Sequence, residues 1–193
     1  MDWYEIIGFV TGVLCVALLI RQNIWNWPIA VVNAVFYIVV FYQSKLYADV
    51  GLQFVFIAIN LYGWYEWHYG GPRNAELLVT RLSVLEIVLS IMAIVFGTWA
   101  VGSILAKNTD AALPYLDSLA TVISLTAQFH MARKKLENWI LWIGVNVLYV
   151  GIYFSRGLFL TQILYVIYFI LAVMGYLAWK KSIRGQNTEI QSP

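Results

Sequence analysis

Two tryptophans, an asparagine and a tyrosine recur at helical spacing near residue 140. The pattern Trp139-x-x-Trp142-x-x-x-Asn146-x-x-Tyr149 advances in steps of three and four, which places the four side chains on one face of a helix. The aromatic rings offer flat surfaces for stacking, and the Asn146 amide both donates and accepts hydrogen bonds. The motif therefore predicts a site for an aromatic heterocycle, and a cationic ring such as pyridinium or thiazolium would gain further from cation–π contact.

Other polar side chains lie within long apolar runs, where hydrocarbon does not tolerate an unpaired amide. Such a group must face a neighbouring helix, a water-filled cavity or a ligand. In the first half of the chain, Trp27, Asn33 and Tyr37 partly repeat the aromatic and amide pattern. The complete set of candidate ligand-binding residues is Trp142, Asn146, Tyr149, Trp139, Gln128, Asn60, Gln53, Asn33 and Tyr37.

Each candidate also has a structural interpretation. Trp27 and Trp139 stand at the starts of apolar segments, where tryptophan often anchors a helix at the membrane interface instead of contacting a ligand. Asn146 can equally hydrogen-bond a neighbouring helix. His130, near the end of a segment, is expected to be an interfacial polar residue.

The sequence favours neither a catalytic nor a metal centre. An enzyme needs a nucleophile paired with a base, or a metal cluster, and no such combination is present. The single cysteine, Cys15, excludes a disulfide framework, and no cofactor motif or GxxxxGK[ST] nucleotide-binding motif occurs. The net charge of +2 gives no reason to expect nucleic acid as a partner.

The composition indicates an integral membrane protein. The chain is 62% hydrophobic and 11% charged, whereas soluble domains are about a quarter charged. A membrane-spanning helix needs about 20 mostly apolar residues, and seven segments qualify. They are residues 5–20, 28–42, 50–67, 84–106, 115–132, 139–154 and 160–179.

The chain repeats itself at an offset of 112 residues. Sliding residues 3–67 onto residues 115–179 superimposes Asn26-Trp27 on Asn138-Trp139 and Trp67 on Trp179. Three spans reverse the direction of the chain, and the extra segment 84–106 restores it, so both triplets run the same way. The sequence therefore predicts a single membrane domain over residues 1–193, in a 3+1+3 parallel-repeat arrangement, with residues 182–193 as a flexible cytoplasmic tail.

The basic residues predict the orientation of these spans. The loops after the first, third and fifth spans, together with the tail, hold nine of the 12 Lys and Arg residues. Basic residues accumulate on the cytoplasmic side, so the C-terminus is expected inside and the N-terminus outside. The run Arg133-Lys134-Lys135 is interpreted as part of this topological signal.

Several motifs in combination resemble the PnuC family of bacterial vitamin transporters, over residues 3–181. They are Asn26-Trp27-Pro28, Phe41-Tyr42-Gln43-x-x-Leu46-Tyr47, Gly63-Trp64-Tyr65-x-Trp67, Trp139-x-x-Trp142-x-x-x-Asn146-x-x-Tyr149 and Gly175-Tyr176-x-x-Trp179. The resemblance implies a SWEET-like membrane fold, a homotrimer, a place in the bacterial inner membrane and a substrate site at Trp139, Trp142, Asn146 and Tyr149.

The resemblance also implies a function. A protein of this kind imports unphosphorylated nicotinamide riboside by facilitated diffusion, and a cytoplasmic kinase traps the product. Thiamine is the alternative vitamin, since both compounds carry a cationic aromatic ring. From a different class, a SWEET-like carrier of sugar or another neutral solute shares the repeat, although it would need fewer aromatic and more hydroxyl-reading side chains.

Overall fold

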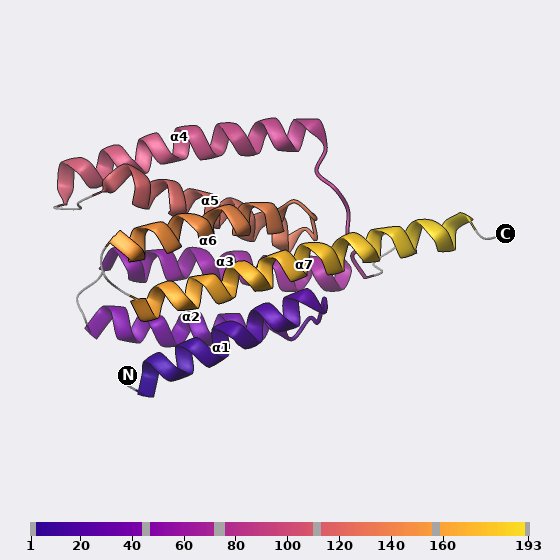
Figure 1. Cartoon of the computed structure of the whole chain (residues 1–193), viewed down its shortest axis with the longest axis horizontal. Helices are drawn as coiled ribbons and strands as arrows, with labels where there is room; N and C mark the ends of the chain where they lie inside the picture. The colour runs from indigo at the N-terminus through magenta and orange to yellow at the C-terminus, as the bar shows by residue number, and fades with distance from the viewer. Residues whose placement is uncertain (1–2, 44–46, 72–75, 110–112, 156–158, 192–193) are drawn as a thin grey trace. The chain divides into compact units, whose positions relative to one another are not determined.

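The computed structural model describes residues 3–43, 47–71, 76–109, 113–155 and 159–191, and within them the chain folds into seven α-helices (Figure 1). The helices are α1 (Trp3–Ile20), α2 (Asn26–Gln43), α3 (Tyr47–Tyr69), α4 (Val84–Asn108), α5 (Pro114–Ala132), α6 (Asn138–Ser155) and α7 (Phe159–Gln191). The predicted all-α fold class is confirmed, and each predicted segment corresponds to one helix.

Helix α7 is longer than the sequence indicated. It was expected to end near Trp179 but continues to Gln191, so the expected tail is helical as far as that residue. No proline interrupts the segment, and Gln186 Nε2 donates a hydrogen bond to Ser182 Oγ one turn earlier, at 3.4 Å.

Length and composition alone mark two of the described helical segments as able to cross a membrane. They are Val84–Asn108 and Gln162–Gln186. Three further apolar stretches are shorter, at Val10–Ile20, Asn26–Val39 and Asn138–Ile152. The arrangement of seven spans and the bundles of residues 3–67 and 115–179 joined by 84–106 stay predictions.

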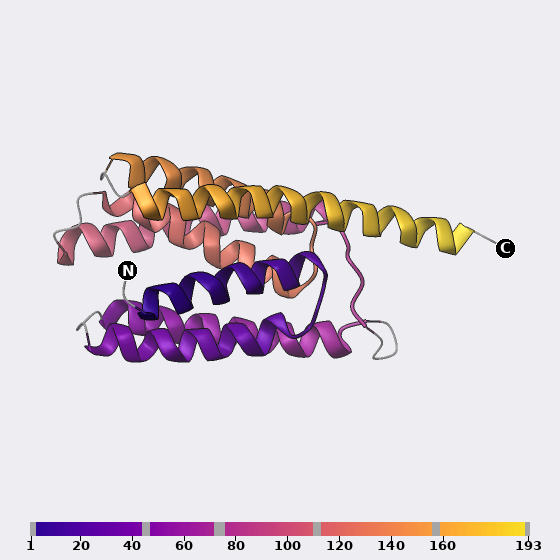
Figure 2. The same ribbon diagram turned by 60° about the horizontal axis from the view of Figure 1, so that its bottom comes forward.

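The helices group into two compact units. Unit 1 comprises Met1–Val79, Ala132–Lys134 and Met174–Pro193, and unit 2 comprises Thr80–Met131 and Lys135–Val173. In unit 1, α1 packs against α2 and α2 against α3, as Figure 2 shows. In unit 2, Ser83 and Glu86 form a capping box that begins α4.

The sequence repeat is visible in the helix bounds and in the turns. Both ends of α2 and α6 differ by 112 residues. The turns before them contain the non-glycine residues with positive φ among those described, Gln22 at 53° and Lys134 at 47°. In each turn the following amide donates to a carbonyl five residues back, from Asn23 to Leu18 and from Lys135 to His130, both at 2.9 Å. This is the Schellman pattern that ends a helix.

The helix that follows each turn also begins in the same way. Asn26 Nδ2 donates to the carbonyl of Asn23, and Asn138 Nδ2 donates to the carbonyl of Lys135. The two halves of the chain therefore use one local design, in which an asparagine amide closes the turn and a tryptophan follows it. The repeated Asn-Trp pair of the sequence has this structural reason.

A glycine on α3 makes room for one of these tryptophans. A Cβ atom added to Gly63 would lie 2.5 Å from Cη2 of Trp27, a ring that is 0% exposed. Gly51, on the same helix, has nothing within 4 Å of the equivalent position. Gly63 therefore permits the close approach of α2 and α3.

We expect Gly63→Ala to lower the free energy of unfolding by about 1–3 kcal/mol, because the added methyl group overpacks a buried ring. The matched control Gly51→Ala should leave stability unchanged or raise it by up to about 1 kcal/mol, since alanine favours helix and meets no neighbour there. Thermal unfolding of the purified protein in detergent measures both. Equal melting temperatures for the two variants would contradict this packing argument.

Candidate functional site

The four residues of the α6 motif lie on the protected side of that helix, in unit 2. Trp139 is 1% exposed and Asn146 is 4% exposed, while Trp142 and Tyr149 are half-buried. Ile140 and Val147, on the other side of α6, are exposed. The spacing argument thus correctly separated the inward from the outward face of this helix.

An aromatic ladder extends this face from α6 to α7 within unit 2. The ring of Tyr149 lies against that of Tyr165, with centroids 4.6 Å apart and planes inclined by 35°. Tyr165 in turn makes an edge contact with Tyr168 at 6.0 Å. The sequence analysis did not single out Tyr165 or Tyr168, whose spacing of three residues was the available signal. The motif therefore continues into a larger aromatic surface.

The candidates from the first half of the chain lie in unit 1. Asn33 of α2 is half-buried and donates from Nδ2 to Thr11 Oγ1 of α1 at 2.7 Å, which is a bond between helices. Tyr37 and Gln53 are also half-buried, whereas Asn60 is 4% exposed. Gln128 of α5 is half-buried and belongs to unit 2. The structure divides the nine candidates between the units, four in unit 1 and five in unit 2.

Three serine and threonine hydroxyl groups of α5 find their partners inside their own helix. Thr121, Ser124 and Thr126 each donate to the carbonyl four residues earlier, at 3.0, 2.8 and 2.8 Å. Such bonds satisfy a hydroxyl in apolar surroundings without a ligand or a second helix. These side chains therefore need no ligand to explain them.

Interfacial anchoring, one of the two interpretations of Trp27 and Trp139, is wrong for both. Their side chains are 0% and 1% exposed, and an anchor needs contact with the lipid headgroups. Trp25, Trp64 and Tyr65, which are 65%, 41% and 62% exposed, have the accessibility that this role requires. A difference of two positions in the sequence separates the buried Trp27 from the exposed Trp25.

Unit 1 instead buries a tryptophan cluster, which we define as Trp27, Trp67 and Trp179. Trp67 makes an edge contact with Trp27 at 5.3 Å and a tilted contact with Trp179 at 5.9 Å. Trp179 Nε1 donates to the carbonyl of Leu19 at 3.1 Å. The cluster therefore joins the ends of α1, α2, α3 and a turn of α7.

A buried lysine that the sequence analysis assigned to topology sits on this cluster. Lys134 is 1% exposed, and its Nζ lies 4.5 Å from the centroid of the Trp67 ring and 3.2 Å from Glu76 Oε1. Burial lowers the pKa of the Lys134 ammonium, and the hydrogen bond and charge of Glu76 oppose that shift. In the repeat, Lys134 aligns with Gln22, a neutral residue. This alignment was the only sequence signal that Lys134 has a role other than a topological one.

His130 of α5 is buried rather than interfacial. It is 4% exposed, and its Nε2 lies 2.7 Å from Ser90 Oγ of α4, in unit 2. The Ser90 hydroxyl also donates to the carbonyl of Glu86 at 2.6 Å. With that proton committed to the backbone, the pair ties α4 to α5 and does not form an activated nucleophile.

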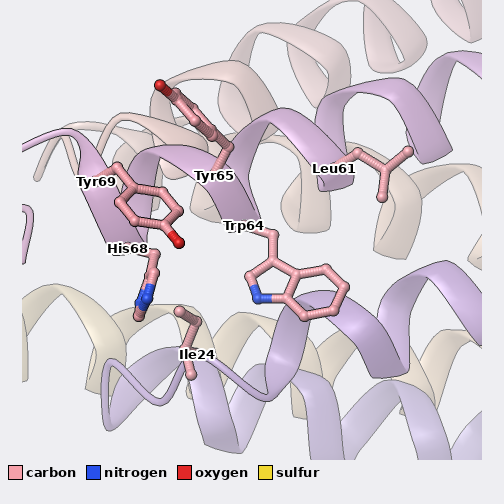
Figure 3. A pocket seen from close by; sticks show the side chains of 6 residues that line it. All are labelled: Ile24, Leu61, Trp64, Tyr65, His68 and Tyr69. Atoms are coloured by element: carbon pink, nitrogen blue, oxygen red, sulfur yellow. The ribbon is translucent and has the colours of Figure 1, made fainter.

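An open pocket of about 490 Å³ lies at the end of α3 in unit 1 (Figure 3). None of the nine candidates contributes to it. Its aromatic residues are exposed, whereas Asn60, Gly63 and Trp67 of the same helix are buried. The lining residues are Ile24, Leu61, Trp64, Tyr65, His68 and Tyr69.

The described residues contain no group of three or more His, Cys, Asp or Glu side chains arranged to hold a metal ion. The candidate ligand-binding residues instead offer aromatic faces, amides and hydroxyl groups. Such groups bind and orient a flat, polar-edged molecule by stacking and hydrogen bonding. This set of side chains is suited to recognising such a ligand.

Comparison with known proteins identifies the family to which the chain belongs. The sequence matches the profile of the family described as "Nicotinamide mononucleotide transporter" over residues 2–181. It is 27% identical to the nicotinamide riboside transporter PnuC of Escherichia coli (strain K12), with 100% of this chain and 91% of that protein aligned. It is 30% identical to PnuC of Neisseria mucosa, with 95% and 74% aligned.

A relative with a different vitamin is nearly as similar. The riboflavin/roseoflavin transporter RibM of Streptomyces davaonensis is 29% identical, with 92% of this chain and 84% of that protein aligned. The fold matches a solved structure, described as that of the vitamin B3 transporter PnuC, with a TM-score of 0.73. That match has 29% identity and covers 94% of this chain and 82% of the other. These relatives are transporters, not enzymes, and the profile spans nearly the whole chain, so the protein belongs to the nicotinamide mononucleotide transporter (PnuC) family, which implies a membrane protein.

Proposed function

We propose that this protein carries unphosphorylated nicotinamide riboside across the bacterial inner membrane. The observation that carries the proposal is the protected face of α6, where Trp142, Asn146 and Tyr149 offer two aromatic rings around one amide. A pyridinium ring would stack on the rings and gain cation–π attraction, while the amide would read a polar edge. The names of several relatives support the choice of vitamin.

The proposed mechanism is facilitated diffusion by alternating access. The two triplets of the repeat would rock about a substrate held near the middle of the membrane. Acidic residues are absent from the centres of the predicted spans, and ion-coupled carriers usually need them there. A cytoplasmic kinase would then supply direction by phosphorylating the vitamin.

Phosphorylation would trap the product for an electrostatic reason. A phosphate adds about one and a half to two negative charges. The predicted spans have no Lys or Arg at their centres to pair with them. The phosphorylated vitamin should therefore not return by the same route, and we propose the riboside, not the mononucleotide, as the substrate.

Thiamine and riboflavin define the alternatives within the same chemistry. Thiamine carries a cationic ring that would use the same contacts, and the relative named as a riboflavin transporter shows that the family accommodates flat heterocycles of different size. The preponderance of aromatic over hydroxyl side chains on the α6 face favours a vitamin over a sugar. We further propose that the protein functions as a homotrimer in the lipid bilayer.

Trp142→Ala and Asn146→Ala should each weaken binding of nicotinamide riboside at least tenfold. That factor corresponds to about 1.4 kcal/mol. For Trp142 it lies within the roughly 1–3 kcal/mol expected of one stacking contact. For Asn146 it lies within the roughly 1–3 kcal/mol lost when a buried polar group is left without its hydrogen-bond partner. Calorimetric titration of purified protein provides the measurement, with thiamine and riboflavin titrated in parallel. Gly144→Ala is the matched control, because Gly144 lies on the exposed side of α6 with nothing within 4 Å of an added Cβ.

Two outcomes would count against this proposal in different ways. Unchanged affinity in both variants, with intact folding, would remove the site assignment but leave the transport function standing. Preferential binding of thiamine or riboflavin by the wild-type protein would keep the site and replace the substrate.

Uptake of nicotinamide riboside into proteoliposomes should proceed without a proton or sodium gradient. The absence of acidic residues from the span centres is the physical reason. Radiolabelled uptake with and without ionophores tests this, and empty liposomes control for leakage. Strict dependence on either gradient would refute facilitated diffusion.

The C-terminus should lie on the cytoplasmic side, because nine of the 12 basic residues lie on that side of the proposed topology. A reporter enzyme that folds only in the cytoplasm, fused after Pro193, should be active. An active periplasmic reporter at the same position would overturn the orientation.

A further inference from the structure

Lys134 is a buried charged residue that takes no part in the proposed binding site. Its ammonium lies over the Trp67 ring at 4.5 Å and pairs with Glu76 at 3.2 Å. The two partners differ sharply in environment, since the Lys134 side chain is 1% exposed and the Glu76 side chain 73% exposed. The pair therefore connects a buried cation to a solvated anion on the segment that follows α3.

The ammonium rests on the centre of the tryptophan cluster. Trp67, the ring beneath it, touches both other members, and Trp179 bonds to the end of α1 through the carbonyl of Leu19. Any movement that separates the ends of α1, α3 and α7 must therefore disturb Trp67 and uncover Lys134. The burial of the Lys134 ammonium therefore depends on whether this end of unit 1 is closed.

A charge is not what closure alone would favour at this position. Burying an ammonium carries a desolvation penalty, and well-packed apolar residues of similar volume often stabilise a protein more than a buried ion pair does. An unbranched methionine would fill the space and contact the Trp67 ring favourably. Lysine makes the closed cluster less stable and the open cluster more stable, because the ammonium regains its hydration when the cluster opens.

The first half of the repeat shows that the turn itself does not require a cation. Gln22 occupies the equivalent left-handed position, and its Nε2 donates to Ser182 Oγ at 3.2 Å in the same unit. The same backbone geometry thus carries a neutral hydrogen bond in one half and a buried charge in the other. The lysine must be explained by something other than the turn.

We propose that Lys134 is a positioning residue for the transport step, which sets how readily the tryptophan cluster of unit 1 opens during transport, with Glu76 opposing that opening. The inference rests on the proposed transport function. It separates two roles: the α6 face binds the vitamin, and Lys134 governs the rate of a conformational change without touching the vitamin. Substitutions at the pair should therefore change rates and leave affinity alone.

The two partners should respond in opposite directions. Lys134→Met removes the hydration that favours opening, so the cluster should open less often. Glu76→Gln leaves the ammonium buried without its anion, so the cluster should open more often. A purely structural role predicts instead that both substitutions loosen the cluster.

Accessibility of position 19 reports this opening directly. Leu19 is 9% exposed and lies against Trp179, so Leu19→Cys in a Cys15→Ser background places one thiol beside the cluster. A membrane-impermeant maleimide is applied from the side that carries the C-terminus. Relative to the same background, labelling should be roughly fivefold faster with Glu76→Gln and at least as much slower with Lys134→Met, the factor that about 1 kcal/mol produces.

Lys135→Met is the matched control. Lys135 is the next residue and pairs with Glu86 at 3.1 Å, and both residues of this pair belong to unit 2. It should leave the labelling rate at position 19 unchanged. A change as large as that of Lys134→Met would show that any charge lost from the basic run has the effect, and would overturn the assignment to Lys134.

Binding and uptake complete the test. Lys134→Met should lower the rate of nicotinamide riboside uptake several-fold with the dissociation constant unchanged in calorimetry. Labelling by Lys134→Met at or above the background rate, or an unchanged rate in Glu76→Gln, would overturn the proposal. The labelling assay needs no vitamin, so its result stands even where the Trp142 and Asn146 variants disprove the binding site.

Discussion

Polar groups in a chain this apolar must be satisfied within the protein, and most of the structure follows from that constraint. The backbone meets it by forming helices throughout the seven predicted spans. Side chains meet it locally: hydroxyls of α5 bond to their own helix, Asn33 bonds to Thr11, and Asn26 and Asn138 close their turns. Asn33, which the sequence suggested as a ligand-binding residue, is thus occupied in holding α1 and α2 together.

The position of each tryptophan in the fold determines its role. Trp27, Trp67 and Trp179 pack against one another in unit 1, with Gly63 leaving space for the first. Trp25 and Trp64 are exposed, and Trp142 stands half-buried on the α6 face. One residue type therefore supplies a buried core, exposed surface positions and a candidate binding surface in the same molecule.

The sequence was sufficient for the helices, the repeat and the inward face of α6, because each depends on periodicity along one segment. It was insufficient for Trp27, since burial depends on which helix lies opposite, and no periodicity within α2 specifies that Gly63 will face it. Lys134 was missed for a related reason: within Arg133-Lys134-Lys135 it resembles a solvated charge, and only the left-handed turn directs it inward. The length of α7 was underestimated because polarity was taken to end a helix that no proline interrupts.

The length of α7 has a mechanical consequence. A helix of 33 residues measures about 50 Å, whereas the hydrocarbon layer of a bilayer is about 30 Å thick. In the proposed topology, the polar part of α7 after Lys181 therefore projects beyond the lipid as a rod. Since Trp179 fastens the base of that rod to α1, a rotation at the level of the tryptophans would be magnified at its tip. The end of α7 at Gln191 would then sweep a wider arc than any side chain in the core, and a spectroscopic probe there would see the motion amplified.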